Sequence, residues 1–471
     1  MIQKHNKMKH TIVLISLILG SFNLFSQTAV TGSQSGTWTL DGSPYEVNGH
    51  ITVPTGQTLS IEAGVEVNFQ GYYKFNVDGK IIVNGTADQM VVFTTDNIGT
   101  GWGGIRLDQT SQISEFHYCK IEHGKTASSG AYPDIHGGAV LLKESNAEFY
   151  NCIFANNDAT GSGDDGMGGA IYAINTGSEE MTLTKFIDCE FINNHAATEG
   201  GAIKFTNDGN TELTNCVFKN NNCNYGGGAI MFYSAVDVHM TKCLFFGNYS
   251  NNSGGGAIKT LNPTVTLYFT NCTFYDNSAY GAGEGGAVAL DYADAMFTNS
   301  IIYDNYQQYG DDVTIGMSAS AIFNFCDVNM PDYGEGANNI YTDPNFVDPS
   351  SYDFHLQSSS PCIDAGTDVG LPYTGANPDM GCYEFGASSS LSESLENSIE
   401  IYPNPVNNSL HISTDAIVVS VEISNLIGKT VIRKSTHNNT LDLSQLNNGT
   451  YLIHVQLDNG TNSVSKLVVA H

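Results

Sequence analysis

The middle of the chain repeats one short phrase, and this repeat limits the folds that the chain can adopt. Two glycines followed by alanine and then isoleucine or valine recur at intervals of 27 to 32 residues, beginning at Gly137, Gly168, Gly200, Gly227, Gly255 and Gly285. A second phrase, Cys-x-Phe-x-x-Asn, falls between the copies, with its cysteines at 152, 189, 216, 243 and 272. A unit this short cannot bury its own apolar face, so the units must stack on one another.

The spacing within each unit indicates strands rather than helices. Cys-x-Phe places two apolar side chains on one face of a strand, and no stretch of the middle region keeps a helical period. Stacked parallel coils would bring identical residues into register. We therefore expect an internal ladder of cysteines, a second of phenylalanines, and a third of asparagines at a turn, where asparagine tolerates the left-handed conformation.

Short apolar runs separated by glycine turns extend the pattern toward the N-terminus, from Ile51 to Thr95. The two repeated phrases together resemble the right-handed parallel β-helix proteins of bacterial surfaces, including chlamydial polymorphic outer-membrane proteins. The stretch from Gly56 to Val65 looks like the opening coils of secreted β-helix proteins of Bacteroidetes. The resemblance implies an all-β fold with a parallel β-helix over residues 27–339. It does not identify a function, because the same architecture hosts lyases, hydrolases, adhesins and passive spikes.

Both ends of the chain are typical of an exported protein. Lys4, Lys7 and Lys9 precede an apolar run over residues 11–25, which is short for a bilayer span and typical of a cleaved secretory signal. We therefore expect residues 1–26 to be a signal peptide and the mature chain to have no transmembrane segment. Residues 340–387 resemble the segment that closes many bacterial β-helices, and residues 388–399 form a polar linker.

The last region, residues 400–471, alternates short strands and turns, which predicts a small β-sandwich. It resembles the C-terminal sorting domain of type IX secretion in the order of its motifs: Tyr402-Pro-Asn-Pro, Asn425-Leu-Ile-Gly-Lys, Gly449-Thr-Tyr and Lys466. The resemblance implies that the type IX machinery is a partner. The mature protein would then be secreted, or attached to the cell surface after export through the outer membrane.

The charge balance excludes one class of partner. The chain has 48 acidic and 18 basic residues, for a net charge of −30. A phosphate backbone would be repelled by such a surface, so nucleic acid is not expected as a partner. An extracellular polysaccharide is compatible with an exported protein of this kind.

The ten cysteines fall into three groups. Those of the repeat, together with Cys119, are expected to act as small apolar fillers inside the coil. Cys362 and Cys382 lie outside the repeat and are the best candidates for a disulfide. Cys223 and Cys326 have no evident partner.

Several residues are candidates for polysaccharide cleavage, which needs a base and a cation if the substrate is a uronate. Lys204 and Lys259 follow Gly-Gly-Ala-Ile at the same repeat position, two coils apart. Arg106 and His136 are the other candidates, and Glu199 is one of the acids beside the glycine pairs. Solubilising surface residues are the commoner interpretation of such lysines and acids.

Carboxylates near the glycine turns could also hold calcium through oxygen ligands or act in glycoside hydrolysis. The candidates for calcium are Asp164, Asp165, Asp311 and Asp312. A solvated acidic ridge that keeps a large β protein soluble is the favoured interpretation. No cofactor other than calcium is suggested by the sequence.

The favoured function is adhesin-like binding of glycans or surfaces without turnover. The alternative is a polysaccharide-degrading enzyme, a lyase or glycoside hydrolase, on the same scaffold. A purely structural surface spike is the third interpretation.

Overall fold

The computed structural model describes most of the chain after the expected signal peptide. In the first part it covers residues 27–127, 130, 132–161, 165–175, 184–207, 211–234, 237–261, 265–281, 285–307, 311–329 and 334–386. In the tail it covers 400–402, 406–407, 409–413, 418–425, 430–435, 440–457 and 462–469. The expected signal peptide (1–26) and linker (388–399) lie outside the described residues.

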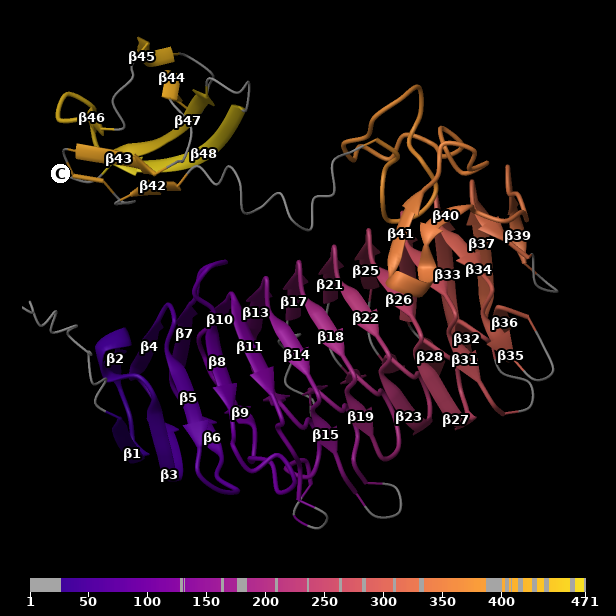
Figure 1. Cartoon of the computed structure of the whole chain (residues 1–471), viewed down its shortest axis with the longest axis horizontal. Helices are drawn as coiled ribbons and strands as arrows, with labels where there is room; N and C mark the ends of the chain where they lie inside the picture. The colour runs from indigo at the N-terminus through magenta and orange to yellow at the C-terminus, as the bar shows by residue number, and fades with distance from the viewer. Residues whose placement is uncertain are drawn as a thin grey trace, which may run out of the picture.

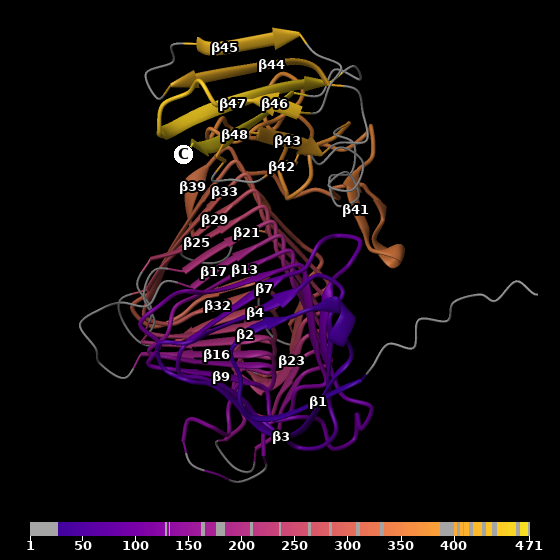
Figure 2. The ribbon, with the colours of Figure 1, turned by 90° about the vertical axis from the view of Figure 1, so that its left-hand side faces the viewer.

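Each coil of the middle region is a closed circuit of short strands joined by tight corners, and successive coils lie one behind the next (Figure 2). One coil shows the pattern: β17 (Thr184–Ile187), β18 (Glu190–Ile192), β19 (His195–Ala196) and β20 (Ile203–Thr206). Asp188 and Asn193 occupy the first two corners with φ of 54° each, a left-handed conformation that Asp and Asn tolerate better than other side chains.

Parallel pairing with the same position of the next coil generates the sheets (Figure 1). The twelve-stranded sheet contains β2 (Gly36–Trp38), β4 (Thr58–Glu62), β7 (Lys80–Asn84), β10 (Ser114–His117), β13 (Ala147–Tyr150), β17, β21 (Thr211–Thr214), β25 (Asp237–Thr241), β29 (Val265–Thr270), β33 (Ala293–Thr298), β37 (Ser320–Asn324) and β39 (Glu335–Ala337). The six-stranded sheet contains β15 (Asp158–Ala159), β19, β23 (Asn222–Tyr225), β27 (Tyr249–Ser253), β31 (Ser278–Ala279) and β35 (Tyr306–Gln307).

A 21-stranded sheet forms the other two faces, because the long strand β3 (Tyr45–Val53) pairs with β1 (Thr28–Ser33) and with strands of both faces. The face that we call the Cys-Phe sheet contains β5 (Glu66–Phe69), β8 (Val91–Thr94), β11 (Cys119–Glu122), β14 (Ile153–Ala155), β18, β22 (Val217–Lys219), β26 (Leu244–Phe246), β30 (Thr273–Tyr275), β34 (Ile301–Tyr303) and β38 (Asp327–Val328). The face that we call the Gly-Ala sheet contains β6 (Phe75–Val77), β9 (Ile105–Asp108), β12 (Val140–Lys143), β16 (Ile171–Ile174), β20, β24 (Ile230–Tyr233), β28 (Ile258–Leu261), β32 (Val288–Leu290) and β36 (Val313–Ile315).

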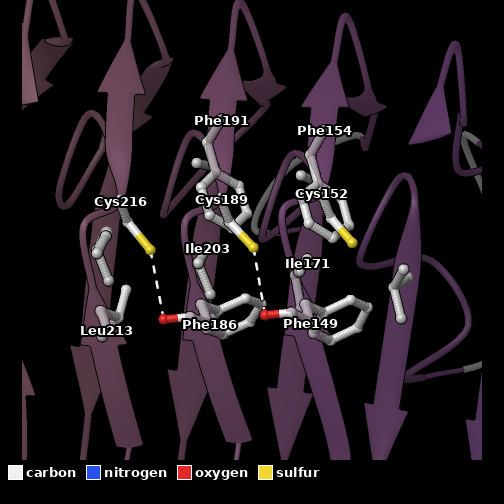
Figure 3. Close-up of a cluster of buried hydrophobic side chains, with 14 of the residues drawn as sticks. Phe149, Cys152, Phe154, Ile171, Phe186, Cys189, Phe191, Ile203, Leu213 and Cys216 are labelled. Atoms are coloured by element: carbon white, nitrogen blue, oxygen red, sulfur yellow. Dashed lines mark hydrogen bonds between the residues drawn. The ribbon is translucent and has the colours of Figure 1, made fainter. Parts of the chain in front are cut away.

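The expected ladders of cysteine and phenylalanine fill one continuous core that extends from Val30 to Val328. Figure 3 shows consecutive cysteines and phenylalanines at equivalent positions of neighbouring coils. Phe191 stacks on Phe218 with 4.7 Å between ring centroids and 2° between planes. The thiol of Cys189 lies 3.4 Å from the carbonyl oxygen of Phe149. Cys326, which had no evident partner in the sequence, aligns with Ser300 and continues the cysteine ladder.

The asparagine ladder is also present, but it lies inside the coil rather than at the left-handed corner. Asn194 Nδ2 donates to Asn221 Oδ1 at 2.9 Å, and Asn221 Nδ2 donates to Asn248 Oδ1 at 3.0 Å. The left-handed residue of each corner is the preceding one, such as Asn193 or Asn220. The buried asparagine amides therefore hold each coil to the next. The residue directly before each of them adopts the left-handed conformation of the corner.

The paired glycines form a corner that no other residue fits. Gly200 has a φ of +68°, and a Cβ on Gly201 would lie 2.0 Å from the carbonyl oxygen of Gly228 in the next coil. The glycine pair thus allows the backbones of successive coils to approach closely before each strand of the Gly-Ala sheet begins.

The segment after the last coil closes the stack and also folds back along its flank. Ile340 exchanges backbone hydrogen bonds with Cys326 and Val328, which completes the final turn. The hairpin of β40 (Phe346–Asp348) and β41 (Asp353–Leu356) then packs its apolar residues against outward side chains of the Cys-Phe sheet, including Phe246. This flanking contact, which reaches back to β22, was not expected from the sequence.

The described residues of the tail form a separate two-layer β unit, as predicted. One sheet contains β42 (Glu400–Tyr402), β43 (Ser409–Ser413) and β46 (Thr440–Asp442), and the other contains β44 (Val418–Asn425), β45 (Thr430–Ser435), β47 (Gly449–Leu457) and β48 (Asn462–Val469). The pairings between these strands are antiparallel, and the strands share an apolar core of their own. The described part of the chain has only two short 3-10 turns, η1 (Leu40–Gly42) and η2 (Pro349–Ser351), and none of its helices could cross a membrane.

Candidate functional site

One outward row of the Gly-Ala sheet contains three of the five candidates for polysaccharide cleavage, Arg106, Lys204 and Lys259. Strand register aligns, coil after coil, the residues Thr52, Asn76, Arg106, Leu141, Tyr172, Lys204, Met231 and Lys259. Lys204 and Lys259 therefore lie two coils apart on one face, as the repeat predicts. A neighbouring row, two residues further along each strand, carries Asp108 and Lys143 in register.

A cavity of about 410 Å³ lies over the N-terminal part of these rows. Its floor comes from three strands of the Gly-Ala sheet, and one wall comes from the loop after β11. The lining residues are Thr52, Asn76, Asp78, Arg106, Asp108, Tyr132, Pro133, Asp134, Leu141 and Lys143. The pocket is therefore mainly polar, and it stands on a rigid parallel sheet.

Arg106 is held at the bottom of this cavity by backbone carbonyls. Its Nε donates to Gly103 at 2.9 Å, and its Nη1 donates to His136 at 2.9 Å and to Gly137 at 2.6 Å. The side chain is 3% exposed, and burial lowers its pKa to about 10. Nη2 is also buried and makes no hydrogen bond to the described residues, so one donor of the guanidinium is left unsatisfied there.

His136 links the pocket to the next coil. Its ring meets Tyr172 edge-on with 4.8 Å between centroids, and its Nδ1 accepts a hydrogen bond from the Met167 amide at 3.2 Å. Burial, followed by the positive charges of Lys204 and Arg106, lowers the pKa of His136 to about 4. The imidazole is therefore neutral at pH 7.

Both candidate lysines form ion pairs. Lys204 Nζ contacts the carboxylate of Glu199 and lies 5.5 Å from the ring centroid of Tyr233. Lys259 Nζ lies 2.8 Å from Asp291 Oδ2. Four of the candidates therefore lie on neighbouring coils of one face: Arg106, His136, Lys204 and Glu199. Lys259 lies further along the face and forms its own ion pair with Asp291.

The candidate calcium ligands do not converge in the described part of the chain. No group of three or more His, Cys, Asp or Glu that could hold a metal occurs among the described residues. Asp165 is half-buried, and Asp164 lies outside the described residues. The backbone carbonyls of Asp311 and Asp312 accept hydrogen bonds from Gly286 and Ala287, so the two acids form the next corner of the coil.

The expected disulfide between Cys362 and Cys382 is absent, because both thiols are free and buried. Cys362 Sγ lies 3.4 Å from Asp327 Oδ2, and the Cys382 amide donates to Thr273 Oγ1 at 3.0 Å. Thr273 and Asp327 are two strands apart in the Cys-Phe sheet. The two cysteines thus contact different strands of the sheet.

Sequence reasoning missed the residues that complete the pocket. Asp78 and Asp108 each follow the last inward residue of a Gly-Ala strand, so alignment of the early coils by register could have found them. Tyr132 and Asp134 belong to an inserted loop after β11 that lies outside the two repeated phrases. Asp134 forms an ion pair with Lys74 at 2.9 Å, which fixes this loop over the strands.

Comparison with protein families agrees with this architecture. Residues 32–141 match the model of the pectate-lyase like β-helix domain, and residues 162–328 match that of the right-handed β-helix region. Residues 400–470 match the secretion system C-terminal sorting domain. No curated protein matches the chain.

The parallel coils, the β-helix matches and the sorting domain together establish the class of protein. The sorting domain implies export, with a secreted or cell-surface location for the mature protein. The chain is a right-handed parallel β-helix protein with a C-terminal sorting domain of the type IX secretion system.

Proposed function

We propose that this exported β-helix protein binds a carbohydrate chain on the Gly-Ala sheet without cleaving it. The observation that carries the proposal is the cavity over Arg106, in which a buried guanidinium keeps one donor without a hydrogen-bond partner among the described residues. The floor of the cavity is built from stacked strands, so its polar groups are positioned before a ligand arrives, which favours binding.

The lining of the cavity suits a sugar. Carboxylates accept hydrogen bonds from hydroxyl groups, and the guanidinium donates to hydroxyl or ring oxygens. Asp78, Asp108 and Asp134 supply acceptors, Arg106 supplies a donor, and the exposed ring of Tyr132 supplies an apolar surface for a sugar face. The next residues of the row, Tyr172, Lys204 and Met231, are buried, so the cavity itself, rather than the whole row, receives the carbohydrate.

Charge pairing argues against turnover. Cleavage needs a free acid or base at the reacting bond. Asp108 is paired with Lys143 at 3.0 Å, and Lys204 is paired with Glu199. Nδ1 of His136 is occupied by a backbone amide, and the ring is neutral. These groups are held in structural contacts, which favours recognition over catalysis.

Arg106 favours the alternative, a polysaccharide lyase. Buried ionisable groups with a perturbed pKa are common at catalytic sites, and burial lowers the pKa of this guanidinium. With a pKa of about 10, the side chain stays protonated at pH 7, so it acts there as a cation and donor rather than as a base.

Affinity electrophoresis of the mature protein in gels containing single polysaccharides tests the proposal. We expect retardation by at least one polysaccharide. Tyr132→Ala and Asp78→Asn should weaken the binding about tenfold, which corresponds to about 1.4 kcal/mol, without changing the melting temperature. Both variants leave the structural contacts of Arg106 in place.

Tyr373→Ala, at an exposed ring outside the cavity, is the matched control and should bind like the wild type. If both cavity variants bound as tightly as the wild type, the carbohydrate would be recognised at a place other than the cavity over Arg106. An absence of retardation by every polysaccharide in the panel would reject the proposed function.

A further inference from the structure

A second outward surface, on the six-stranded sheet, combines aromatic and amide side chains. These short strands follow one another along the lower edge of the stack in Figure 1. Side chains two residues apart on a strand share a face. Over β23, β27, β31 and β35 and the residues directly after them, the outward positions are Asn222, Asn224, Tyr249, Asn251, Ser278, Tyr280 and Tyr306. We call this set the tyrosine-amide face.

None of these outward residues is charged, although the chain has a net charge of −30. The nearest described carboxylates along the same coils are Asp276 and Asp304, which stand at the corner that borders the face. An uncharged surface bordered by carboxylates would bind an anionic polymer poorly, whereas a neutral ligand escapes this repulsion.

Two of the three tyrosines of this face present their rings to solvent. Tyr280 and Tyr306 are 51% and 54% exposed, and their centroids are 6.1 Å apart on consecutive coils. Tyr225, at the end of β23, is 47% exposed. Tyrosine combines an apolar ring with a polar hydroxyl, so a row of such rings can stack on the apolar faces of sugar units and bond to their hydroxyls.

The amides are held in place by the coil structure. Asn224 Nδ2 donates to the carbonyl oxygen of Ala197 at 2.7 Å, and its Oδ1 accepts from Asn251 Nδ2 at 3.1 Å. Asn222 Oδ1 contacts His195 Nδ1 at 2.6 Å. The face therefore loses little conformational freedom when a ligand binds, which favours affinity.

We propose that the tyrosine-amide face binds a neutral polysaccharide chain, as a second site separate from the cavity over Arg106. The repeating rings and amides suit a repeating, uncharged ligand with hydroxyl groups. Two sites on one rigid stack would raise the overall affinity for a long or surface-displayed polymer through effective concentration.

Pull-down of the full mature protein with insoluble cellulose, and affinity electrophoresis in a soluble neutral β-glucan and in polygalacturonate, test this site. We expect binding to at least one neutral glucan. The double variant Tyr280→Ala/Tyr306→Ala should weaken it about tenfold, through loss of two stacking rings. Tyr341→Ala, which removes a ring of similar exposure outside the face, is the matched control and should bind like the wild type.

Tyr132→Ala removes a ring of the cavity and the double variant removes rings of this face, so measuring both variants with each polysaccharide separates failure of the cavity proposal from failure of this one. Undiminished binding by the double variant would overturn the second site, as would an absence of binding to both neutral glucans. Sedimentation of the same samples gives a further test. If the wild type sedimented as a dimer and the double variant as a monomer, the face would bind a second copy of the chain instead of a polysaccharide.

Discussion

The ring of Phe218 stacks on that of Phe245, with 4.7 Å between the centroids and 5° between the planes. Phe191 stacks on the opposite side of Phe218 at 4.7 Å. The phenylalanine of each coil is thus packed between its counterparts in the coils before and after it. Because the same contact recurs at each step, the repeat length in the sequence becomes a fixed register in the structure.

Phe218→Ala should destabilise the solenoid by about 3–5 kcal/mol, because it removes a fully buried ring and leaves a cavity between two coils. Chemical denaturation followed by circular dichroism measures the change. Thr214→Ala, at a half-buried outward position of β21, should cost less than about 1 kcal/mol. A loss as large at Thr214 as at Phe218 would contradict the inward register of the phenylalanines.

Lys219, the residue after Phe218 on β22, would be a less neutral control than Thr214. Its side chain points outward, but Nζ lies 3.2 Å from the ring centroid of Tyr352 in the flanking segment. Such a cation–π contact is expected to contribute about 0.5–1 kcal/mol. The alternation of strand residues predicts the direction of this side chain, whereas the partner comes from a segment outside the repeat.

Asn221→Asp should destabilise the chain by at least about 3 kcal/mol, measured in the same way. Asn221 Nδ2 donates to the carbonyl oxygen of Phe191 at 2.8 Å and to Asn248 Oδ1 at 3.0 Å. A carboxylate would face both acceptors without a donor, in a fully buried place.

Asn220→Asp is the control for this substitution, one residue earlier. Asn220 occupies the left-handed corner with φ of 53°, and later coils carry Asp276 and Asp304 at the equivalent corner with φ of 51° and 55°. We expect a change within about 0.5 kcal/mol. If Asn220→Asp were the more damaging of the two, the amide ladder would not be what holds the coils together.

All ten cysteines should react with a thiol reagent when the mature protein is unfolded without a reductant, because all ten are free in the structure. In the folded protein the reaction should be slow, since every thiol is buried. If only eight thiols reacted and Cys362 and Cys382 did not, the two would form the disulfide expected from the sequence. That result would contradict the free thiols of the structure.

Asp312→Asn should stabilise the protein more at pH 8 than at pH 4. Burial, followed by the charges of Asp304 and Asp311, raises the pKa of Asp312 from 3.8 to about 7. The folded state therefore holds a proton that the unfolded state has lost between those two values, and ionisation of Asp312 costs stability as the pH rises through this window. The benefit of the amide should grow from about pH 4 to pH 7 and then level off.

Melting temperatures measured across this range check the prediction. Asp237→Asn, at an exposed carboxylate on β25, serves as the control at each pH. A gain from Asp312→Asn that did not change with pH would contradict the burial of the Asp312 carboxyl.

Much of the fold follows from the repeat alone. A residue that recurs every 27 to 37 positions must stack on its own copies, so the ladders through Cys189, Phe191 and Asn194 could be predicted from spacing. The corner conformation was assigned one residue too late, because Asn193 and Asn194 are both asparagine and the pattern does not distinguish the left-handed residue from the buried one. The flanking segment follows no repeat, so spacing gave no sign that it folds back over β22.

The candidate site was only partly predictable for the same reason. Lys204 and Lys259 were placed on one face by their shared repeat position, which the strand register confirms. Their ion pairs with Glu199 and Asp291 depend on side-chain geometry that spacing does not determine. Tyr132 belongs to an insertion, and its position over Arg106 depends on how that loop folds.

The most direct test of the proposed function is to incubate the mature protein with polysaccharides that retard it in affinity gels and to follow chain length, new reducing ends and the absorbance of unsaturated uronates. Binding without cleavage predicts retardation with no change in any of the three over prolonged incubation. Steady release of reducing ends or unsaturated uronates that is lost in Tyr132→Ala would show that the cavity over Arg106 is an active site, and would contradict the account given for it.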